Sequence, residues 1–357
     1  MELDPTLNIG KCLWCGSEIT IEAGKSGGNA PQIDAIYEDR ISPTECRKNL
    51  LDFICDNPYM PDELFDQVEN ADPCVCFIPG YFFQADWHAN WNAESGHDSK
   101  NEKGETVTEW TPVNGQTMGV EHYCSPANAM IVNRQMGDMF ITLSETLPRD
   151  EAKEFNPEML EGKVWLPSDY SEEDGFSNFA SERLDSHIES VCEKQIPGDQ
   201  QRNLRFTSEH TLTAKRVLIP CCIFSYTWKD QKRSIIQDAY QGKIVGDTPK
   251  TVVRLLSLII LVIFGLTNLV SSLYLWNRVG NSTNNGWMFS LVSLAVLVIL
   301  PGWYHLHCLS VRKGFKNLDA DGRGEASKKL KKWERSFMII ALILLALICG
   351  GVLYALK

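Results

Sequence analysis

Three long apolar runs in the last third of the chain constrain its fold more than any other feature. Residues 255–276, 287–304 and 337–356 contain no Asp, Glu, Lys or Arg. A helix of about 20 residues covers the roughly 30 Å hydrocarbon layer of a bilayer, whereas a buried helix of a water-soluble protein normally keeps a polar stripe. The runs therefore predict three transmembrane helices in a membrane domain of residues 251–357.

The residues that flank these runs predict an orientation. The connection 277–286 holds one basic residue, whereas the stretch 308–336 holds nine, and basic loops stay on the cytoplasmic side of a membrane. We therefore expect residues 1–250 to lie in the cytoplasm at the plasma (inner) membrane, with the carboxyl terminus outside. The runs lack the ionisable residues that mark transport pathways. An integral membrane anchor is therefore favoured, and an accessory subunit of a transport complex stays the alternative.

Charge is unevenly divided along the chain. Residues 1–250 hold 22 Lys and Arg against 42 Asp and Glu, whereas residues 251–357 hold 12 against 4. Such an acidic surface repels phosphate backbones, because proteins bind nucleic acids largely through Lys and Arg. The composition therefore argues against nucleic acid as a partner. It favours partner proteins that carry a basic patch, whose association would be sensitive to salt.

The chain contains twelve cysteines, and its first ten residues, MELDPTLNIG, hold no apolar run of the kind that a secretory signal needs. Irregularly spaced cysteines in a long chain of this kind favour reduced thiols over a disulfide framework. We therefore expect a cytosolic redox environment around them.

Residue patterns in the middle of the chain, residues 42–250, predict an α+β cytoplasmic domain. A helix is expected to begin at an N-cap Ser42, with Pro43 in its first turn, and to end before Pro58. A second long helix is expected within residues 172–196, where apolar residues recur at steps of three and four. Aromatic and β-branched residues predict antiparallel β-hairpins in the segments 74–91, 105–113 and 216–246.

Two of these strand blocks resemble each other. Ile78, Pro79, Phe83 and Trp87 align with Ile219, Pro220, Phe224 and Trp228 at a constant offset of 141 residues. An internal repeat and chance similarity both stay open as explanations. A Pro near the start of a strand indicates an edge or first position, where its missing N–H costs no ladder bond. Each block would then form one hairpin of a small sheet.

The stretch GKCLWCGSEI, residues 10–19, resembles the first half of a zinc ribbon. Cys12 and Cys15 have the spacing at which two thiolates hold one Zn²⁺, and Gly16 permits the tight turn of a zinc knuckle. A closed structural site needs four ligands, and a second C-x-x-C is missing. Three interpretations of residues 1–41 stay open: a structural zinc site completed by distant ligands, a degenerate ribbon without metal, and thiol redox chemistry. The redox interpretation is the weakest, because SEITIE after the pair predicts a strand instead of a helix.

No motif of an active site stands out. The segment GKSGG at residues 24–28 has Ile19 where a phosphate-binding loop needs Gly, and no helix is expected directly after it. The segment 319–330 departs from a calcium loop at Arg323 and Leu330. We therefore expect a protein without enzyme activity. The alternative is a membrane-tethered thiol oxidoreductase that uses Cys12 and Cys15.

The order of these features resembles a bacterial family of membrane-anchored proteins headed by a TFIIB-type zinc ribbon, often labelled primosomal protein N′-like. The resemblance rests on the C-x-x-C-G knuckle at residues 12–16 and on FIPGYFFQADW, ADWHANWNA, WTPVNG, VLIPCCIFSYTW and GKIVGDTP. It covers roughly residues 10–250, and the missing second C-x-x-C is its clearest departure. Relatives are encoded beside SPFH (flotillin-like) and PspA-like proteins. The resemblance thus implies an adaptor or scaffold in an envelope-stress assembly, with those proteins as partners.

Overall fold

The structure is a computed structural model and describes residues 8–11, 18–21, 33–71, 73–133, 136–279, 286–318 and 320–356. The chain divides into two compact units, each assembled from separate stretches of sequence. Unit 1 comprises Met1–Cys46, Pro73–Ser225 and Ser234–Gly246. Unit 2 comprises Arg47–Asp72, Tyr226–Arg233 and Asp247–Lys357.

The strands form one sheet of two strands and one of eight in the described part of the chain. The small sheet pairs β1 (Asn8–Lys11) with β2 (Glu18–Ile21). The large sheet contains β3 (Ala35–Ile36), β4 (Val75–Lys100), β5 (Thr106–Pro126), β6 (Lys153–Glu154), β7 (Val164–Trp165), β8 (Gln200–Trp228), β9 (Gln231–Asp238) and β10 (Ile244–Gly246).

The helices fall into two groups. Those that pack on the large sheet are α3 (Ala129–Asn133), α4 (Gly137–Ser144), α5 (Glu172–Phe179) and α6 (Ser181–Gln195), with 3₁₀ turns η1 (Arg149–Glu151) and η2 (Pro157–Leu160). Unit 2 contains α2 (Glu63–Glu69), α7 (Val252–Val279), α8 (Gly286–Gly314), η3 (Phe315–Asn317) and α9 (Ala320–Leu356), while α1 (Pro43–Asp56) crosses the division. The predicted helix after Ser42 is therefore confirmed, and Ser42 Oγ accepts a hydrogen bond from the Glu45 N–H at 3.3 Å.

The α+β class is confirmed, and β4 with β5 and β9 with β10 form antiparallel pairs as predicted, but the predicted small sheet is wrong, because the sheet is larger and mixed. β4 pairs antiparallel with β5 and β8, whereas β3 runs parallel to β8 and β7 runs parallel to β4. The strands also run well beyond their predicted ends, β4 to Lys100 and β8 back to Gln200. These extensions are mostly polar, so they lack the aromatic and β-branched pattern on which the prediction relied.

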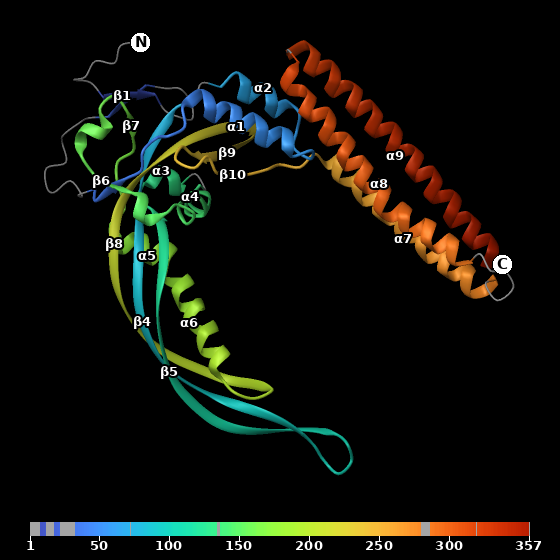
Figure 1. Ribbon diagram of the computed structural model, residues 1–357, viewed down its shortest axis with the longest axis horizontal. Helices are drawn as coiled ribbons and strands as arrows, with labels where there is room; N and C mark the ends of the chain where they lie inside the picture. The colour runs from blue at the N-terminus through green and yellow to red at the C-terminus, as the bar shows by residue number, and fades with distance from the viewer. Residues whose placement is uncertain are drawn as a thin grey trace. The chain divides into compact units, whose positions relative to one another are not determined.

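Helices α5 and α6 cover one face of the long strands β4, β5 and β8 (Figure 1). The buried residues of β4 on that face alternate between small and large side chains: Ala85, Trp87, Ala89, Trp91 and Ala93. Trp87 pairs across the ladder with Gly119 and Trp91 with Gly115. A Cβ atom at Gly119 would lie 2.8 Å from Cζ2 of Trp87, so only glycine leaves room for the indole. This core therefore depends on uncharged packing of large rings over small residues.

The single helix predicted within residues 172–196 is two helices. Ala180, at the break, adopts φ −122° and is fully buried. Phe176 of α5 and Leu184 of α6 still pack into the same core, so the periodic apolar residues were assigned to the correct face.

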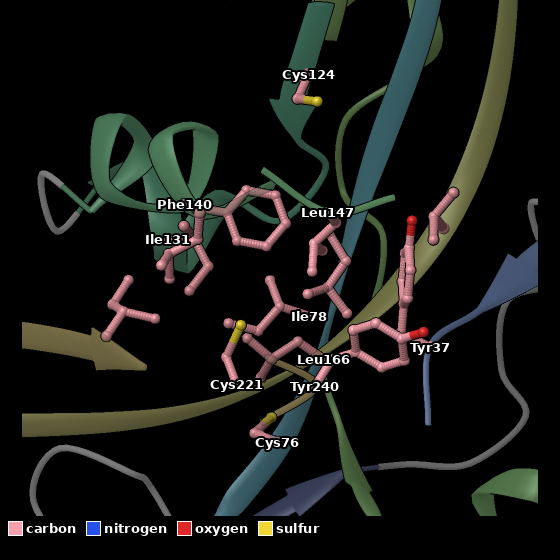
Figure 2. Packing of buried hydrophobic residues seen from close by; sticks show 14 of the residues in the cluster. Tyr37, Cys76, Ile78, Cys124, Ile131, Phe140, Leu147, Leu166, Cys221 and Tyr240 are labelled. Carbon is pink, nitrogen blue, oxygen red and sulfur yellow. The ribbon is translucent and has the colours of Figure 1, made fainter. Parts of the chain in front are cut away.

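A second core lies where the sheet meets α3 and α4. Figure 2 shows Ile131 and Phe140 from these helices beside Ile78 of β4, with Cys221 of β8 close by. Tyr37 and Tyr240 pack edge to face on another side of this core, with their ring centroids 4.9 Å apart.

The two prolines of the similar blocks lie inside long strands, so the expected edge or first positions are wrong. Pro79 pairs with Leu218, and Pro220 pairs with Phe77. Pro79 sits between the end of the β5 ladder, at Gly80, and the β7 ladder, which contacts Cys76 and Phe77. At such a junction no neighbouring strand needs the missing N–H, which explains how an interior strand tolerates proline.

The prediction of three transmembrane helices at 255–276, 287–304 and 337–356 is also wrong. In the part of the chain that the structure describes, no helix has the combined length and apolarity needed to span a bilayer. The apolar runs belong to longer helices with buried charged residues: Arg254 in α7, Arg312 in α8 and Glu334 in α9. The prediction failed because it considered each apolar run alone, although the helix that contains the run continues into turns with charged residues. The location at the plasma membrane stays a prediction.

Candidate functional site

The basic stretch of residues 308–336 packs against the acidic helices α1 and α2 within unit 2. Three of its ion pairs join Lys313 to Asp56 at 3.5 Å, Arg323 to Asp66 at 3.2 Å and Lys331 to Glu63 at 2.7 Å. Further pairs join Lys316 to Asp52 and Arg323 to Glu69. Much of the positive charge in this stretch is therefore neutralised by carboxylates from far earlier in the sequence.

Asp62 is the centre of this charge pairing. Its two oxygens accept hydrogen bonds from Arg254 at 2.8 and 2.9 Å, from Arg312 at 2.6 Å and from the Ser327 hydroxyl at 2.7 Å. Arg254 also pairs with Glu334 at 2.6 Å. The Asp62 side chain is only 4% exposed, and both guanidinium groups are at most 1% exposed.

The backbone before α2 accepts the remaining hydrogen bonds of the two arginines. Arg254 donates to the carbonyl oxygens of Pro58 and Met60 at 2.9 and 3.1 Å, and Arg312 donates to Met60 and Ile54 at 2.6 and 2.8 Å. This ionic cluster therefore fixes the loop between α1 and α2 to three other helices. Its charges are largely satisfied within the unit, which favours a structural role.

Burial and charge act in opposite directions on the groups of the ionic cluster. Burial lowers the pKa of Arg312, and Asp62 offsets only part of that effect. Burial also disfavours charged Arg254, but Asp62 and Glu334 outweigh it and raise its pKa. Burial raises the pKa of Glu334 above its ordinary value despite the attraction of Arg254. As the pH falls, Glu334 therefore takes up a proton at a higher pH than an ordinary glutamate does.

The carboxylates of α5 and α6 differ from those of α1 and α2. The exposed acidic residues of α6 are Glu182, Asp185, Glu189 and Glu193. Among the described residues, none of these four takes part in an ion pair. Arg183, the arginine of α6, pairs with Glu145 instead. The first turn of α5 adds Glu172, Glu173 and Asp174. We call this set of residues the acidic face; its four α6 carboxylates have no ion-pair partner in the described part of the chain.

A cleft of about 430 Å³ lies beside the acidic face, lined by Glu121, His122, Tyr123, Glu145, Arg149, Arg183 and His187. The His187 ring pairs with Glu121 at 3.0 Å. Arg149 donates to the backbone oxygens of Phe83 and Tyr123, both at 3.2 Å. The charges of the cleft are therefore mutually satisfied.

The chemistry of the cleft suits binding better than catalysis. A His–Glu pair is the arrangement that orients a general base, but it needs a nucleophile or a substrate proton within hydrogen-bond reach. Tyr123 supplies the one hydroxyl among the lining residues, and burial raises its pKa, which disfavours the phenolate. The expectation that the protein is not an enzyme stays a prediction.

The predicted metal ligands Cys12 and Cys15 lie outside the described residues, as does the segment GKSGG. The strands on either side of the cysteine pair are described, and the strand predicted in SEITIE is confirmed as β2. In the described ranges, no cluster of three or more His, Cys, Asp or Glu could hold a metal ion. The zinc prediction therefore stays untested.

Neither the ionic cluster nor the row of exposed carboxylates on α6 was identified from the sequence. The amphipathic pattern of residues 172–196 was noted for its apolar residues, although the same pattern places four carboxylates on the solvent side of α6. The signal was therefore present in the sequence. No local signal could have paired Asp62 with Arg254 and Arg312, because they lie 192 and 250 residues apart.

No family model, no curated protein and no solved structure matches this chain. The resemblance to membrane-anchored zinc-ribbon proteins therefore stays a prediction.

Proposed function

We propose that the protein is a non-enzymatic adaptor that binds a basic surface of a partner protein through the acidic face of α5 and α6. The observation that carries this proposal is the contrast in charge pairing. Five carboxylates of α1 and α2 are neutralised by arginines and lysines: Asp52, Asp56, Glu63, Asp66 and Glu69. By contrast, Glu182, Asp185, Glu189 and Glu193 of α6 are exposed and form no ion pair with any residue that the structure describes. An unpaired stripe of one sign attracts a complementary partner and accelerates its association.

The way in which α6 is held supports a binding role. Leu184, Ile188 and Cys192 are buried against the sheet, so the helix is fixed by its apolar side while its acidic side remains in solvent. The N-terminus of α5 is fixed by Ser171, whose hydroxyl accepts a hydrogen bond from the Asp174 N–H at 3.1 Å. A rigid surface loses little conformational entropy on binding, which favours affinity.

SPFH- and PspA-type proteins are the partners to test first, because the resemblance of the sequence implies them. A pull-down with the full chain, at about 50 mM and about 500 mM salt, should retain a partner only at the lower concentration, because screening weakens exposed charge pairs. Mass spectrometry then identifies the partner. Failure to retain any protein at either salt concentration would contradict the proposal.

A charge-matched comparison then assigns the binding to α6. The variant E182Q/D185N/E189Q/E193Q keeps side-chain size and removes four charges, and we expect it to bind the partner at least about tenfold more weakly. The control E102Q/E109Q/E154Q/E161Q removes four exposed charges elsewhere in unit 1 and should bind within about twofold to threefold of the wild type. Equal loss in both variants would mean that only total charge matters, and the proposed binding face would be wrong.

A further inference from the structure

Two of the cysteines that the structure describes lie in the same small buried cluster. Cys46 of α1 and Cys222 of β8 pack with Ala239 in a small buried cluster, which Ile41 and Val75 cover. Both cysteines are free thiols, and both belong to unit 1.

The alternation of strand residues explains why Cys222 meets α1. Cys221 and Cys222 are consecutive in β8, so their side chains point to opposite faces of the sheet. Cys221 pairs with Cys76 and belongs to the core of Figure 2. Cys222 pairs with Val75 and faces the other way, where the first turn of α1 places Cys46 against it.

Cys46 is the better nucleophile of the pair. Hydrogen bonding between the two side chains lowers the pKa of Cys46, whereas the same interaction and burial raise the pKa of Cys222. Cys46 also lies in the first turn and a half of α1, where unpaired backbone N–H groups favour a negative charge. By contrast, burial raises the pKa of Cys55, Cys76, Cys124, Cys192, Cys221 and Cys308.

We propose that Cys46 and Cys222 are a site of reversible oxidation, at which a peroxide converts the two thiols into a disulfide that links α1 to β8. The geometry that carries this proposal is the buried cluster that the two cysteines share, in which the alternation of β8 turns Cys222 away from Cys221 and toward the start of α1. The proposal involves neither Cys12 nor Cys15 and does not depend on the adaptor function.

The chemistry balances with hydrogen peroxide as the oxidant. The Cys46 thiolate attacks one peroxide oxygen, the O–O bond breaks, and the departing hydroxide takes up a proton to form water. Cys46 is then a sulfenic acid, oxidised by two electrons. The sulfur of Cys222 attacks the Cys46 sulfur, the S–O bond breaks, and the released hydroxide leaves as water with the Cys222 proton. Two thiols and one peroxide thus give one disulfide and two waters.

Burial of the pair selects a small oxidant. The exposed fraction is 1% for Cys46 and 5% for Cys222, yet residues 42–45 directly before Cys46 are all exposed. The pair thus lies beneath one surface turn of α1. Hydrogen peroxide is small and uncharged, so it needs only a slight opening of this turn, whereas a peptide disulfide such as oxidised glutathione needs a larger one.

The test treats the full chain with one to five equivalents of hydrogen peroxide, blocks remaining thiols with iodoacetamide and maps the products by peptide mass spectrometry. We expect a linked peptide that contains Cys46 and Cys222, reversed by dithiothreitol. On a non-reducing gel the oxidised chain should migrate faster, because the link closes a long loop. C46S and C222S should lose the shift, whereas C192S, a substitution at another buried cysteine, should keep it.

A measurement on the wild type keeps the test independent of how the variants fold. At pH 7, a small alkylating reagent should modify Cys46 at least about tenfold faster than Cys192, because the thiolate is the reactive form. The proposal is overturned if peroxide yields no 46–222 link in the folded wild type. It is equally overturned if Cys46 and Cys192 are alkylated at the same rate.

Discussion

The two units of this protein use opposite kinds of core. In unit 1, two tryptophans of β4 pack over glycines of β5 in a core built mainly of apolar side chains, and the buried Arg216 at its border donates to the Tyr81 hydroxyl. In unit 2, a buried carboxylate, Asp62, joins two buried arginines from different helices. Apolar packing tolerates small changes of shape, whereas a buried charge that loses its partner is left uncompensated. A single substitution in the core should therefore reduce the stability of unit 2 more than that of unit 1.

The largest effect is expected for D62N. The substitution keeps the size of the side chain but leaves Arg312 without its buried counter-charge and Arg254 with Glu334 alone, which costs about 3–5 kcal/mol of stability. Hydrogen exchange measured by mass spectrometry should show faster exchange across residues 47–72 and α7, with the protection of β4 and β5 unchanged. D66N is the matched control, because Asp66 is 50% exposed and contacts Arg323 at the edge of the cluster. If both variants behave alike, the ionic cluster is not what holds unit 2 together.

A smaller effect is expected when the packing of unit 1 is disturbed. G119A places a Cβ atom 2.8 Å from the Trp87 indole, and relief of this clash should cost about 1–3 kcal/mol. Near-ultraviolet circular dichroism, which senses the surroundings of tryptophan, should change together with the denaturation midpoint. G324A in α9 is the control, because nothing lies within 4 Å of a Cβ there, and a helical alanine should be neutral or stabilising by up to about 1 kcal/mol. A neutral G119A would show that β5 can move away from the indole.

The units should also respond differently to acid. The raised pKa of Glu334 means that the folded state binds its proton before the unfolded state does, so this residue adds stability as the pH falls from 7 toward its ordinary pKa. E334Q lacks that contribution, and its unit 2 should lose stability more steeply than the wild type over the same range.

The opposite effect is expected for Glu94 in unit 1, whose pKa is lowered by hydrogen bonding from Arg202. In E94Q, the stability of unit 1 should decline less steeply than in the wild type below about pH 4.5. Hydrogen exchange at three pH values checks both directions, and a change of the same sign in the two variants would contradict the assignment.

The smallest effect is expected for exposed ion pairs in either unit. Lys331 contacts Glu63 at 2.7 Å, yet their side chains are 43% and 53% exposed. K331Q should therefore change the stability of unit 2 by less than about 1 kcal/mol. Denaturant unfolding measures this difference directly. A loss comparable to that of D62N would mean that the whole acidic–basic interface acts as one network.

Sequence patterns predicted the features of this fold that depend on neighbouring residues and missed those that depend on residues far apart in the sequence. Ser42 and Pro43 located the start of α1, and aromatic alternation located β4 and β8, because caps and alternation depend on neighbours in the chain. The mixed pairing of the sheet depends on β3 and β7, which are two residues each and carry no recognisable pattern. The apolar runs suggested membrane spans, and the pairing of Arg254 and Arg312 with Asp62, 192 and 250 residues earlier, has no local sequence signal. The buried cluster shared by Cys46 and Cys222 has no local signal either, because they lie far apart in the sequence.

The central claim is that the carboxylates of α1 and α2 serve the fold, whereas those of α6 are available to a partner. The most direct test compares two variants that each lose four charges, E182Q/D185N/E189Q/E193Q and D52N/D56N/E63Q/E69Q, for partner binding and for hydrogen exchange in the same preparations. We predict that the first variant loses binding with exchange unchanged, and that the second keeps binding while residues 47–72 exchange faster. If the second variant loses binding while the first retains it, the claim is contradicted.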